Sequence, residues 1–401
     1  MRGAGEHMTT AFEFFSPVRI LFGRGGFQQL GTLAAEAGRT ALLVTNAGQS
    51  GDGGLVDQAG QLLREAGVGV AFHRQRGEPT VRDIETALTT ARNSSCQLVV
   101  GLGGGSALDT AKAVAGLIAN GGGPLDYLEV VGRGQKLHTP ATPWIAVPTT
   151  AGTGAEVTRN AVIGVPERGF KASLRSELLL PRIALIDPEL AVGVSAAVTA
   201  RSGMDALCQL IEAYTSRGAQ PITDALARES IGRAARALPR AVTDGQDRDA
   251  REEMALAALF SGIALTHAGL GAVHGFAAPA GANYPIPHGT VCARLLPPVV
   301  AANAAALAAE APDHPLLDKY RELGRLLTGR TELADDQAIE AGVRFLVQLV
   351  EQLEIPRLTD FGLQPEGFAP LIALARRSSS MRYNPVTLSD SALEEILRQA
   401  C

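Results

Sequence analysis

The chain has 401 residues, a formal net charge of −5 and hydrophobic residues at 46% of its positions. This length exceeds one ordinary hydrophobic core and predicts two domains of roughly 150 to 200 residues each. Acidic and basic residues are interspersed without a basic stripe, so we expect neither nucleic acid nor an anionic membrane surface as a partner. A small-molecule partner fits this composition better.

The cysteines indicate a reducing compartment. Cys96, Cys208, Cys292 and Cys401 are far apart and form no CxxC pair, so neither a disulfide framework nor a structural zinc site is expected. Residues 1–15 lack the basic start and apolar core of a signal peptide. No run reaches the roughly 18 uncharged apolar residues of a membrane span. We therefore expect a cytoplasmic protein without a membrane partner.

The first 190 residues alternate short apolar runs with amphipathic stretches. The apolar runs at 41–44 and 97–100 predict buried strands, and helical periodicity predicts helices over 27–37, 55–66 and 80–92. Strands that alternate with helices predict a mostly parallel sheet wrapped by helices. The first domain, residues 1–190, is therefore expected to be α/β and Rossmann-like.

Beyond Pro188 the pattern becomes helical. Alanine- and leucine-rich segments predict helices over 195–216, 221–237, 249–268, 301–311, 317–327, 336–353 and 366–377. The second domain, residues 191–401, is thus predicted to be all-α. Residues 181–188 form the predicted joint. Because the joint contains no Gly/Ser linker, we expect the domains to pack closely around a cleft.

A glycine-rich turn follows the strand predicted at 97–100. Ser106 and Asp109 have capping-box spacing, which predicts that a helix begins at Ser106 with its free N–H groups facing the turn. Glycines without Cβ atoms let a pyrophosphate approach the backbone and the positive end of the helix dipole. The alternative is a tight turn without a ligand, since neither GxGxxG nor a Walker A loop is present. The glycines concerned are Gly103, Gly104 and Gly105.

A second polar loop follows the apolar run at 144–147. It offers hydroxyl groups among small residues, and its threonines are Thr149, Thr150 and Thr153. On its own it is equally a polar connection. Together with the glycine turn it indicates hydroxyl and backbone donors that grip a nucleotide.

A third polar group lies in the helical half of the chain. Asp205 and Gln209 are four residues apart on one helical face and are aimed at the same point. With His274 and His288, Asp205 has the composition of a site with two histidines and one carboxylate, so binding of Fe²⁺ or Zn²⁺ is a hypothesis. Structural histidines are the alternative. Cys208 points off that face and is predicted to belong to the core.

Motifs in this order across nearly the whole chain resemble the iron-containing (group III) alcohol dehydrogenase family, which includes maleylacetate reductases and is related to dehydroquinate synthases. The resemblance implies that NAD or NADP and a catalytic divalent metal meet in a cleft between an α/β dinucleotide-binding domain and a helical domain. The motifs are FGRG at 22–25, the GGGS turn with Asp109 and Lys112, PTTAGTGAE at 148–156, Lys171, Pro181, Asp187-Pro188, GMDAL at 203–207, AGLGAVHG at 268–275 and PHG at 287–289.

The resemblance also assigns roles in the nucleotide pocket. Gly104, Gly105 and Ser106 are expected to bind the pyrophosphate. The residues expected to line the ribose and nicotinamide side are Thr149, Thr150, Thr153 and Lys171. Asn46 stands where NAD-preferring members carry aspartate. Because a neutral amide does not repel a 2′-phosphate, both NAD and NADP remain open.

The metal site departs from the family pattern. The metal-dependent members have ligands at the positions of Asp205, Gln209, His274 and His288, with histidine where this chain has Gln209. Glutamine offers only a neutral carbonyl oxygen, a poorer ligand than imidazole. The family often has a proton-relaying histidine four residues after His274, where this chain has Ala278. His267, two helical turns before His274 on the same predicted face, is the candidate replacement, with a structural histidine as the alternative.

Two mechanisms remain open for the predicted interconversion of an alcohol with an aldehyde or ketone. A divalent ion polarises the carbonyl oxygen, or the Gln209 amide and a protonated His288 stabilise the oxyanion without metal, as maleylacetate reductases make credible. The competing functions are a lyase or synthase of the dehydroquinate-synthase type that uses bound NAD transiently, and a nucleotide-binding pseudoenzyme. The resemblance also implies a homodimer or larger homo-oligomer.

Overall fold

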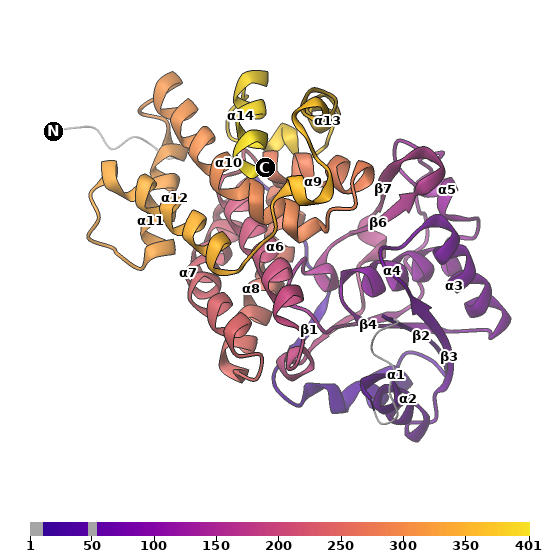
Figure 1. The fold of residues 1–401 in the computed structure, drawn as a ribbon. Helices are drawn as coiled ribbons and strands as arrows, with labels where there is room; N and C mark the ends of the chain where they lie inside the picture. The colour runs from indigo at the N-terminus through magenta and orange to yellow at the C-terminus, as the bar shows by residue number, and fades with distance from the viewer. Residues whose placement is uncertain (1–10, 47–53) are drawn as a thin grey trace.

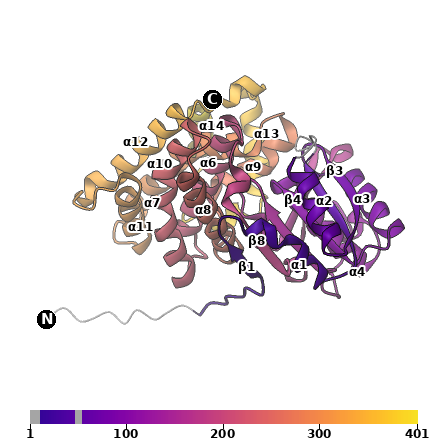
Figure 2. The same ribbon diagram turned by 90° about the horizontal axis from the view of Figure 1, so that it is seen from below.

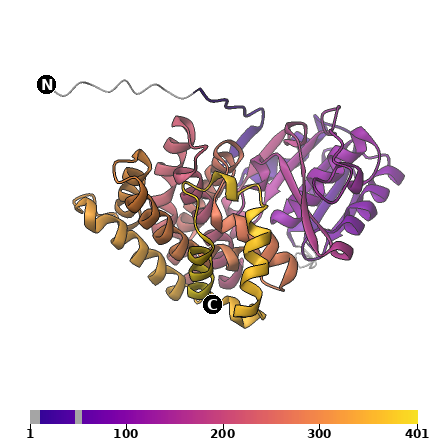
Figure 3. The ribbon, with the colours of Figure 1, turned by 90° about the horizontal axis from the view of Figure 1, so that it is seen from above.

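Two domains lie side by side in the computed structural model, which describes residues 11–46 and 54–401 (Figure 1). The views from below and above show the sheet-containing domain at one end of the molecule and the helical domain at the other (Figures 2 and 3). The C-terminus lies in the helical domain (Figure 1). The predicted fold class, an α/β domain followed by an α-helical domain, is confirmed.

A six-stranded sheet, entirely parallel, forms the centre of the first domain, with the strand order β1-β8-β5-β4-β2-β3. Every residue of β4 and β5 is buried, as expected for strands with helices on both faces. The runs predicted as strands lie within β2 and β4. The strands are β1 (Arg19–Phe22), β2 (Thr40–Asn46), β3 (Gly69–Gln75), β4 (Leu98–Gly103), β5 (Trp144–Pro148) and β8 (Ile183–Ile186).

Alternate residues of β2 show how helices cover both faces of this sheet. Leu42 and Val44 pack in one buried cluster with residues of α3 (Val81–Asn93) and α4 (Gly105–Asn120). Ala41 and Leu43 point to the other face and pack with residues of α1 (Leu30–Ala35) and α2 (Leu55–Glu65). This alternation follows from the two-residue period of a strand. A short helix, α5 (Pro124–Tyr127), precedes β5.

Three details of the α/β domain differ from the sequence predictions. The helix expected over 27–37 is a 3₁₀ turn, Gly26–Gln29, followed by the short α1. Residues 183–186, expected in the joint, form the buried strand β8. A two-stranded antiparallel hairpin, β6 (Asn160–Val165) and β7 (Phe170–Arg175), was not predicted and lies outside the main sheet.

The second domain is built on one large apolar core shared by most of its helices. Its helices are α6 (Ala196–Thr215), α7 (Pro221–Thr243), α8 (Arg248–Ala268), α9 (Ala272–Asn283), α10 (His288–Glu310), α11 (Pro315–Thr328), α12 (Asp335–Gln352), α13 (Phe368–Arg376) and α14 (Asp390–Ala400). By length and composition α10 could cross a membrane, but 67% of its apolar window is buried inside the protein. It is the core helix around which its neighbours pack.

The domains are in direct contact, as the missing linker predicts. Ala184 and Ile186 of β8 share a buried apolar cluster with Leu259 and Ile263 of α8. A few residues away the two backbones touch, since a Cβ atom at Gly154 would lie only 2.6 Å from the Cα atom of Gly262. The backbone contact between Gly154 and Gly262 therefore closes one side of any cleft between the domains.

Candidate active site

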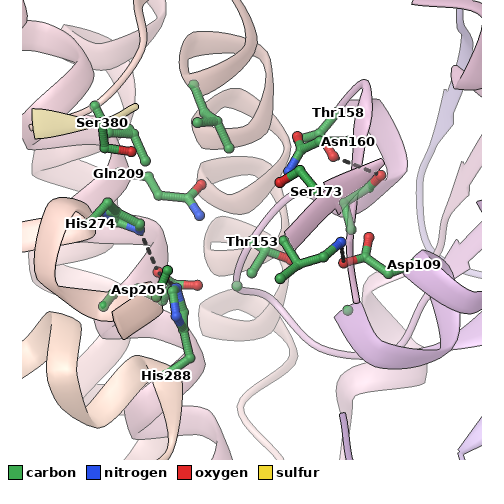
Figure 4. A pocket seen from close by; sticks show the side chains of 18 of the residues that line it. Asp109, Thr153, Thr158, Asn160, Ser173, Asp205, Gln209, His274, His288 and Ser380 are labelled. Atoms are coloured by element: carbon green, nitrogen blue, oxygen red, sulfur yellow. Dashed lines mark hydrogen bonds and ion pairs between the residues drawn. The ribbon is translucent and has the colours of Figure 1, made fainter. Parts of the chain in front are cut away.

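A cavity of about 490 Å³ lies between the domains. Its walls include the beginning of α4 and the polar loop after β5 on one side, and α6, α8, α9 and α10 on the other. Figure 4 shows Asp109 and Thr153 facing Asp205, Gln209, His274 and His288 across this space. Of the residues expected at the site, the wall contains Gly105, Ser106, Asp109, Thr150, Thr153, Lys171, Asp205, Gln209, His267, His274 and His288.

The glycine turn is shaped for a close-approaching anion. Gly103 has φ +155°, and a Cβ atom there would lie 2.2 Å from Asn46 Oδ1. The threonine loop closes over the turn, because Cβ atoms at Gly104 and Gly105 would each lie 3.2 Å from a threonine hydroxyl. The predicted capping box is wrong. Helix α4 begins at Gly105, and no side chain of the described residues caps it, so the N–H groups of Gly105 and Ser106 are available to an anion.

Asp109 and Lys112 support the wall of the pocket instead of capping α4. Asp109 accepts a hydrogen bond from the backbone N–H of Val162 at 3.0 Å, which ties α4 to β6. The buried Lys112 ammonium donates to Thr158 Oγ1 at 2.9 Å and to the Asn160 carbonyl at 2.7 Å. Burial lowers the pKa of Lys112 and raises that of Asp109. The pair fixes the β6–β7 hairpin at the edge of the cavity.

Asn46 holds the glycine turn. At the end of β2 its Oδ1 atom accepts the backbone N–H of Gly104 at 2.8 Å. Neither Asn46 nor Gly103, Gly104 and Thr149 belongs to the cavity wall itself. Asn46 therefore acts on the turn from behind, a role that its sequence position did not reveal.

The helical wall brings one carboxylate and two imidazoles together. Asp205 Oδ1 lies 3.2 Å from His274 Nε2 and 3.5 Å from His288 Nε2. Asp205 belongs to the middle of α6, while His274 and His288 lie in the first turns of α9 and α10. The sequence prediction that these three residues meet is thus matched by their geometry.

Glu212, which the sequence analysis missed, orients His274. Its carboxylate lies 2.6 Å from His274 Nδ1 and accepts the backbone N–H of Val273 at 2.7 Å. With Nδ1 donating to Glu212, His274 presents Nε2 toward Asp205, which is the usual arrangement around a metal-binding histidine. The signal was present in the sequence, because Glu212 lies seven residues after Asp205 on the same helical face.

The cluster has opposed charges. Burial alone would raise the pKa of Asp205, but the imidazoles of His288 and His274 hold it well below its usual range. Burial works against protonation of His288, yet Cys292 and Asp205 raise its pKa to about 10. Burial also opposes protonation of His274, whose pKa Cys292, Asp205 and Glu212 raise well above the usual value. Such a concentration of negative groups suits a divalent cation as well as protons.

Gln209 and His267 are held by other contacts. Gln209 Oε1 lies 3.1 Å from the Ser261 hydroxyl of α8. His267 stacks on Phe14 with 4.2 Å between ring centroids, and burial lowers its pKa. The prediction that His267 shares a helical face with His274 is wrong. Helix α8 ends at Ala268, and the pair α8 and α9 is bent by 100° at this break.

Cys208 and Cys292 are both buried near this cluster. Cys208 belongs to the core, as predicted, although its Sγ lies 3.9 Å from His274 Nδ1. Cys292 lies one helical turn after His288 and was not expected at the site.

Two family models match the chain. The model of the iron-containing alcohol dehydrogenase matches residues 17–188, and the model of the C-terminal part of the same family matches residues 199–401. The chain belongs to the iron-containing alcohol dehydrogenase family. Like the family, it is an oxidoreductase that interconverts alcohols with aldehydes or ketones using a nicotinamide cofactor. The resemblance noted in the sequence is confirmed.

Relatives span the full length of this alcohol dehydrogenase. A choline dehydrogenase of Bacillus subtilis is 34% identical, over 98% of this chain and 96% of its own length. A 1,3-propanediol dehydrogenase of Klebsiella pneumoniae is 34% identical, over 98% of each chain.

Solved structures of similar proteins have the same fold. A 1,3-propanediol oxidoreductase matches with a TM-score of 0.90 and 34% identity, over 98% of this chain and 100% of the other. A sulfoacetaldehyde reductase of Bifidobacterium kashiwanohense in complex with NAD⁺ matches with a TM-score of 0.83 and 29% identity, over 97% of this chain and 98% of the other.

Proposed function

We propose that the cavity between the domains is where this alcohol dehydrogenase performs hydride transfer. The observation that carries the proposal is the juxtaposition of the uncapped start of α4 with the cluster of Asp205, His274 and His288 across one cavity. When bound, the nicotinamide carries the hydride, and a divalent cation polarises the substrate oxygen. Residues of the two cavity walls hold the nicotinamide and the cation close to each other.

The nucleotide is proposed to lie on the sheet side. Backbone N–H groups of Gly105 and Ser106 bind the pyrophosphate at the positive end of α4, while Gly104, whose own N–H donates to Asn46, keeps the approach free of a Cβ atom. The ribose and nicotinamide side is proposed for Thr149, Thr150, Thr153 and Lys171. Gly103 gives the turn its shape, and Asp109 braces the wall. No carboxylate stands at position 46, so we propose that the enzyme uses NAD(H) and tolerates NADP(H).

The cation is proposed to lie on the helical side, held by Asp205, His274 and His288. Three such ligands suit Fe²⁺ or Zn²⁺, and Glu212 fixes the tautomer of His274. Gln209 contacts the cavity next to this cluster, where its amide can donate to the substrate oxygen. His267, kept neutral by burial, is positioned at the cavity wall to exchange a proton with substrate or solvent.

An unpaired arginine points to the substrate class. Arg201 lines the cavity one helical turn before Asp205 and has no hydrogen-bond or ion-pair partner among the residues that the structure describes. Other cations of the wall are neutralised, in the pairs Lys171–Glu78, Arg159–Glu177 and Arg175–Glu129. A half-buried guanidinium without a partner favours a planar anion. We therefore propose an aldehyde or ketone substrate with a carboxylate or similar anionic group.

Paired substrates test this assignment. NADH and NADPH oxidation are measured with 4-oxobutanoate and with butanal, a neutral aldehyde of the same chain length. We expect Arg201→Met to raise the KM for 4-oxobutanoate by about 10- to 100-fold, as for loss of a charge-assisted hydrogen bond. The KM values for butanal and NADH should stay within about threefold.

The control is Arg159→Gln, which removes a cation that Glu177 already pairs. It should have a smaller effect on 4-oxobutanoate. A preference for butanal in the parent enzyme, or an equal effect of Arg201→Met on both aldehydes, contradicts the anionic substrate. No oxidation of either nucleotide with any carbonyl contradicts the location of the reaction itself.

We also propose that the enzyme works in the cytoplasm as a homodimer or larger homo-oligomer. Four free cysteines support a reducing compartment, and the family resemblance supports self-association. Light scattering of the purified protein measures its mass directly, and a monomer at micromolar concentration contradicts the second part.

A further inference from the structure

Cys292 completes a four-membered cluster of metal-binding groups. Ligand atoms of Asp205, His274, His288 and Cys292 all lie within 4.8 Å of one another. Cys292 Sγ is 3.6 Å from His288 Nε2 and 3.7 Å from His274 Nε2. The thiol lies on α10 one turn after His288, so the helix presents both groups on one face.

The separations agree with a tetrahedron around one ion. Bond lengths of about 2.0 Å to nitrogen or oxygen and about 2.3 Å to sulfur place nitrogen and oxygen ligands about 3.3 Å apart, and nitrogen and sulfur ligands about 3.6 Å apart. The two distances that include Asp205 Oδ1 are 3.2 and 3.5 Å. The two distances that include sulfur are 3.6 and 3.7 Å. These four of the six separations thus agree with zinc-like coordination, and the other two are within 4.8 Å.

We propose that Cys292, and not Gln209, is the fourth protein ligand of the divalent cation, which makes this a site of one carboxylate, two imidazoles and one thiolate. The proposal deepens the proposed metal-assisted function, on which it rests for its catalytic meaning. The Gln209 oxygen faces the Ser261 hydroxyl. On binding, the Cys292 thiol loses its proton to solvent and the sulfur donates to the ion, with no change of oxidation state.

The thiolate approaches from the protein interior. Asp205, His274 and His288 contribute to the cavity wall, whereas Cys292 is fully buried and does not. A cation held by the four would therefore be reached from the cavity side. A substrate oxygen arriving there would be a fifth ligand, an expansion that catalytic zinc sites use.

A thiolate also changes which metal the site prefers. Zinc already binds most sites of nitrogen, oxygen and sulfur ligands more tightly than Fe²⁺ does, and a thiolate ligand strengthens this preference. We therefore expect this member of an iron-containing family to retain zinc in preference to iron when both are offered in equal amounts under anaerobic conditions.

Cys208 provides a matched control. It is buried in the same helical core and lies near the same imidazole, but its Sγ faces Nδ1 of His274 at 3.9 Å. That nitrogen is already engaged by Glu212 at 2.6 Å. Since one imidazole presents only Nε2 to the cluster, Cys208 is on the wrong side of the ring to share the ion.

Cobalt substitution tests the proposal. The full-length protein is stripped with a chelator, loaded with Co²⁺ and examined for the near-ultraviolet absorption of a cobalt–thiolate bond. The parent and Cys208→Ser should show the band, and Cys292→Ser should lose it. Zinc affinity of Cys292→Ser should fall by at least about tenfold, since even loss of a group that merely supports a ligand costs 10- to 100-fold.

X-ray absorption of the zinc-loaded parent keeps the test independent of any variant's folding, and should show one sulfur at about 2.3 Å. A shell of nitrogen and oxygen alone, a cobalt band that survives in Cys292→Ser, or failure of the parent to bind either metal overturns the proposal. Nucleotide oxidation is measured on the same samples. A sulfur ligand without turnover would count against the proposed function only, and turnover without a sulfur ligand against Cys292 only.

Discussion

Asn46 lies behind the glycine turn and outside the cavity wall, at the position proposed to influence cofactor choice. Its Oδ1 atom accepts the N–H of Gly104 at 2.8 Å. Aspartate has the same shape and can accept the same hydrogen bond, so Asn46→Asp adds a charge at constant geometry. This separates the electrostatic role of the position from its role in holding the turn.

We predict that Asn46→Asp raises the KM for NADPH by at least about tenfold, because roughly 1 to 2 kcal/mol of repulsion acts on a 2′-phosphate and not on a free hydroxyl. The KM for NADH should change less than about threefold. Initial rates with each nucleotide at saturating carbonyl measure both. Equal losses for the two nucleotides would show that the substitution only damages the turn.

At the scale of single residues, the sequence predicted only some members of the candidate site. Asp205, His274 and His288 were predicted to meet because their residue types and flanking glycines are informative. Cys292 was not predicted, because its proximity depends on where α10 crosses α6 and α9, a tertiary relation that no local spacing encodes. The Ser106–Asp109 pair satisfied a capping pattern, yet Asp109 instead accepts the Val162 N–H of a hairpin distant in sequence.

The strand, turn and helix formed by β4, Gly104 and α4 act as one element. Gly103 ends the strand, and its missing Cβ makes room for Asn46 Oδ1 on one side and Ala107 on the other. The sequence predicted the strand, turn and helix, and the glycines after an apolar run led to the hypothesis that the turn binds a pyrophosphate. Gly269, with a φ of +70°, ends α8 at Ala268 as predicted, but the 100° bend from α8 into α9 was not predicted, because local sequence does not encode the angle between successive helices.

We predict that Gly103→Ala raises the dissociation constant for NADH by at least about tenfold, because a Cβ atom 2.2 Å from Asn46 Oδ1 must displace the turn that receives the nucleotide. Fluorescence titration of NADH measures the effect, and zinc content should not change. Gly121→Ala at the other end of α4 is the control, since it has φ +75° but no atom within 4 Å of the new Cβ. Similar weakening in both variants would mean general strain of the helix.

At the scale of the molecule, the site exists only while the two domains stay in contact. Gly154 of the threonine loop and Gly262 of α8 meet backbone to backbone, and a Cβ atom at Gly262 would lie 2.4 Å from the Gly154 carbonyl oxygen. Neither glycine was predicted to have this role, because alanine-rich helices give no sequence signal for interdomain approach. The predicted absence of a flexible linker did indicate that such an interface was required.

We predict that Gly262→Ala destabilises the protein by about 1 to 3 kcal/mol, as for overpacking of a tight contact, and lowers kcat by moving the nucleotide wall away from the cation wall. Denaturant unfolding and steady-state kinetics measure the two effects. Gly232→Ala on α7 is the control, because the nearest atom to its new Cβ is the flexible end of Arg236 at 3.1 Å. That variant should be neutral or slightly stabilised. A Gly262→Ala enzyme with unchanged stability would refute the close contact.

The place of β8 determines the order in which the protein can be assembled during synthesis. Among the described strands, β1 comes first in the chain and pairs with β8, the last strand of the sheet. Its edge therefore stays open until nearly the whole domain has been made, and this long-range pairing is slow to form. The helices that carry Asp205, His274 and His288 are synthesised afterwards, and α8 packs on β8. Because Ser378, Ser380 and Tyr383 also line the cavity, its wall is complete only when nearly the whole chain has been made.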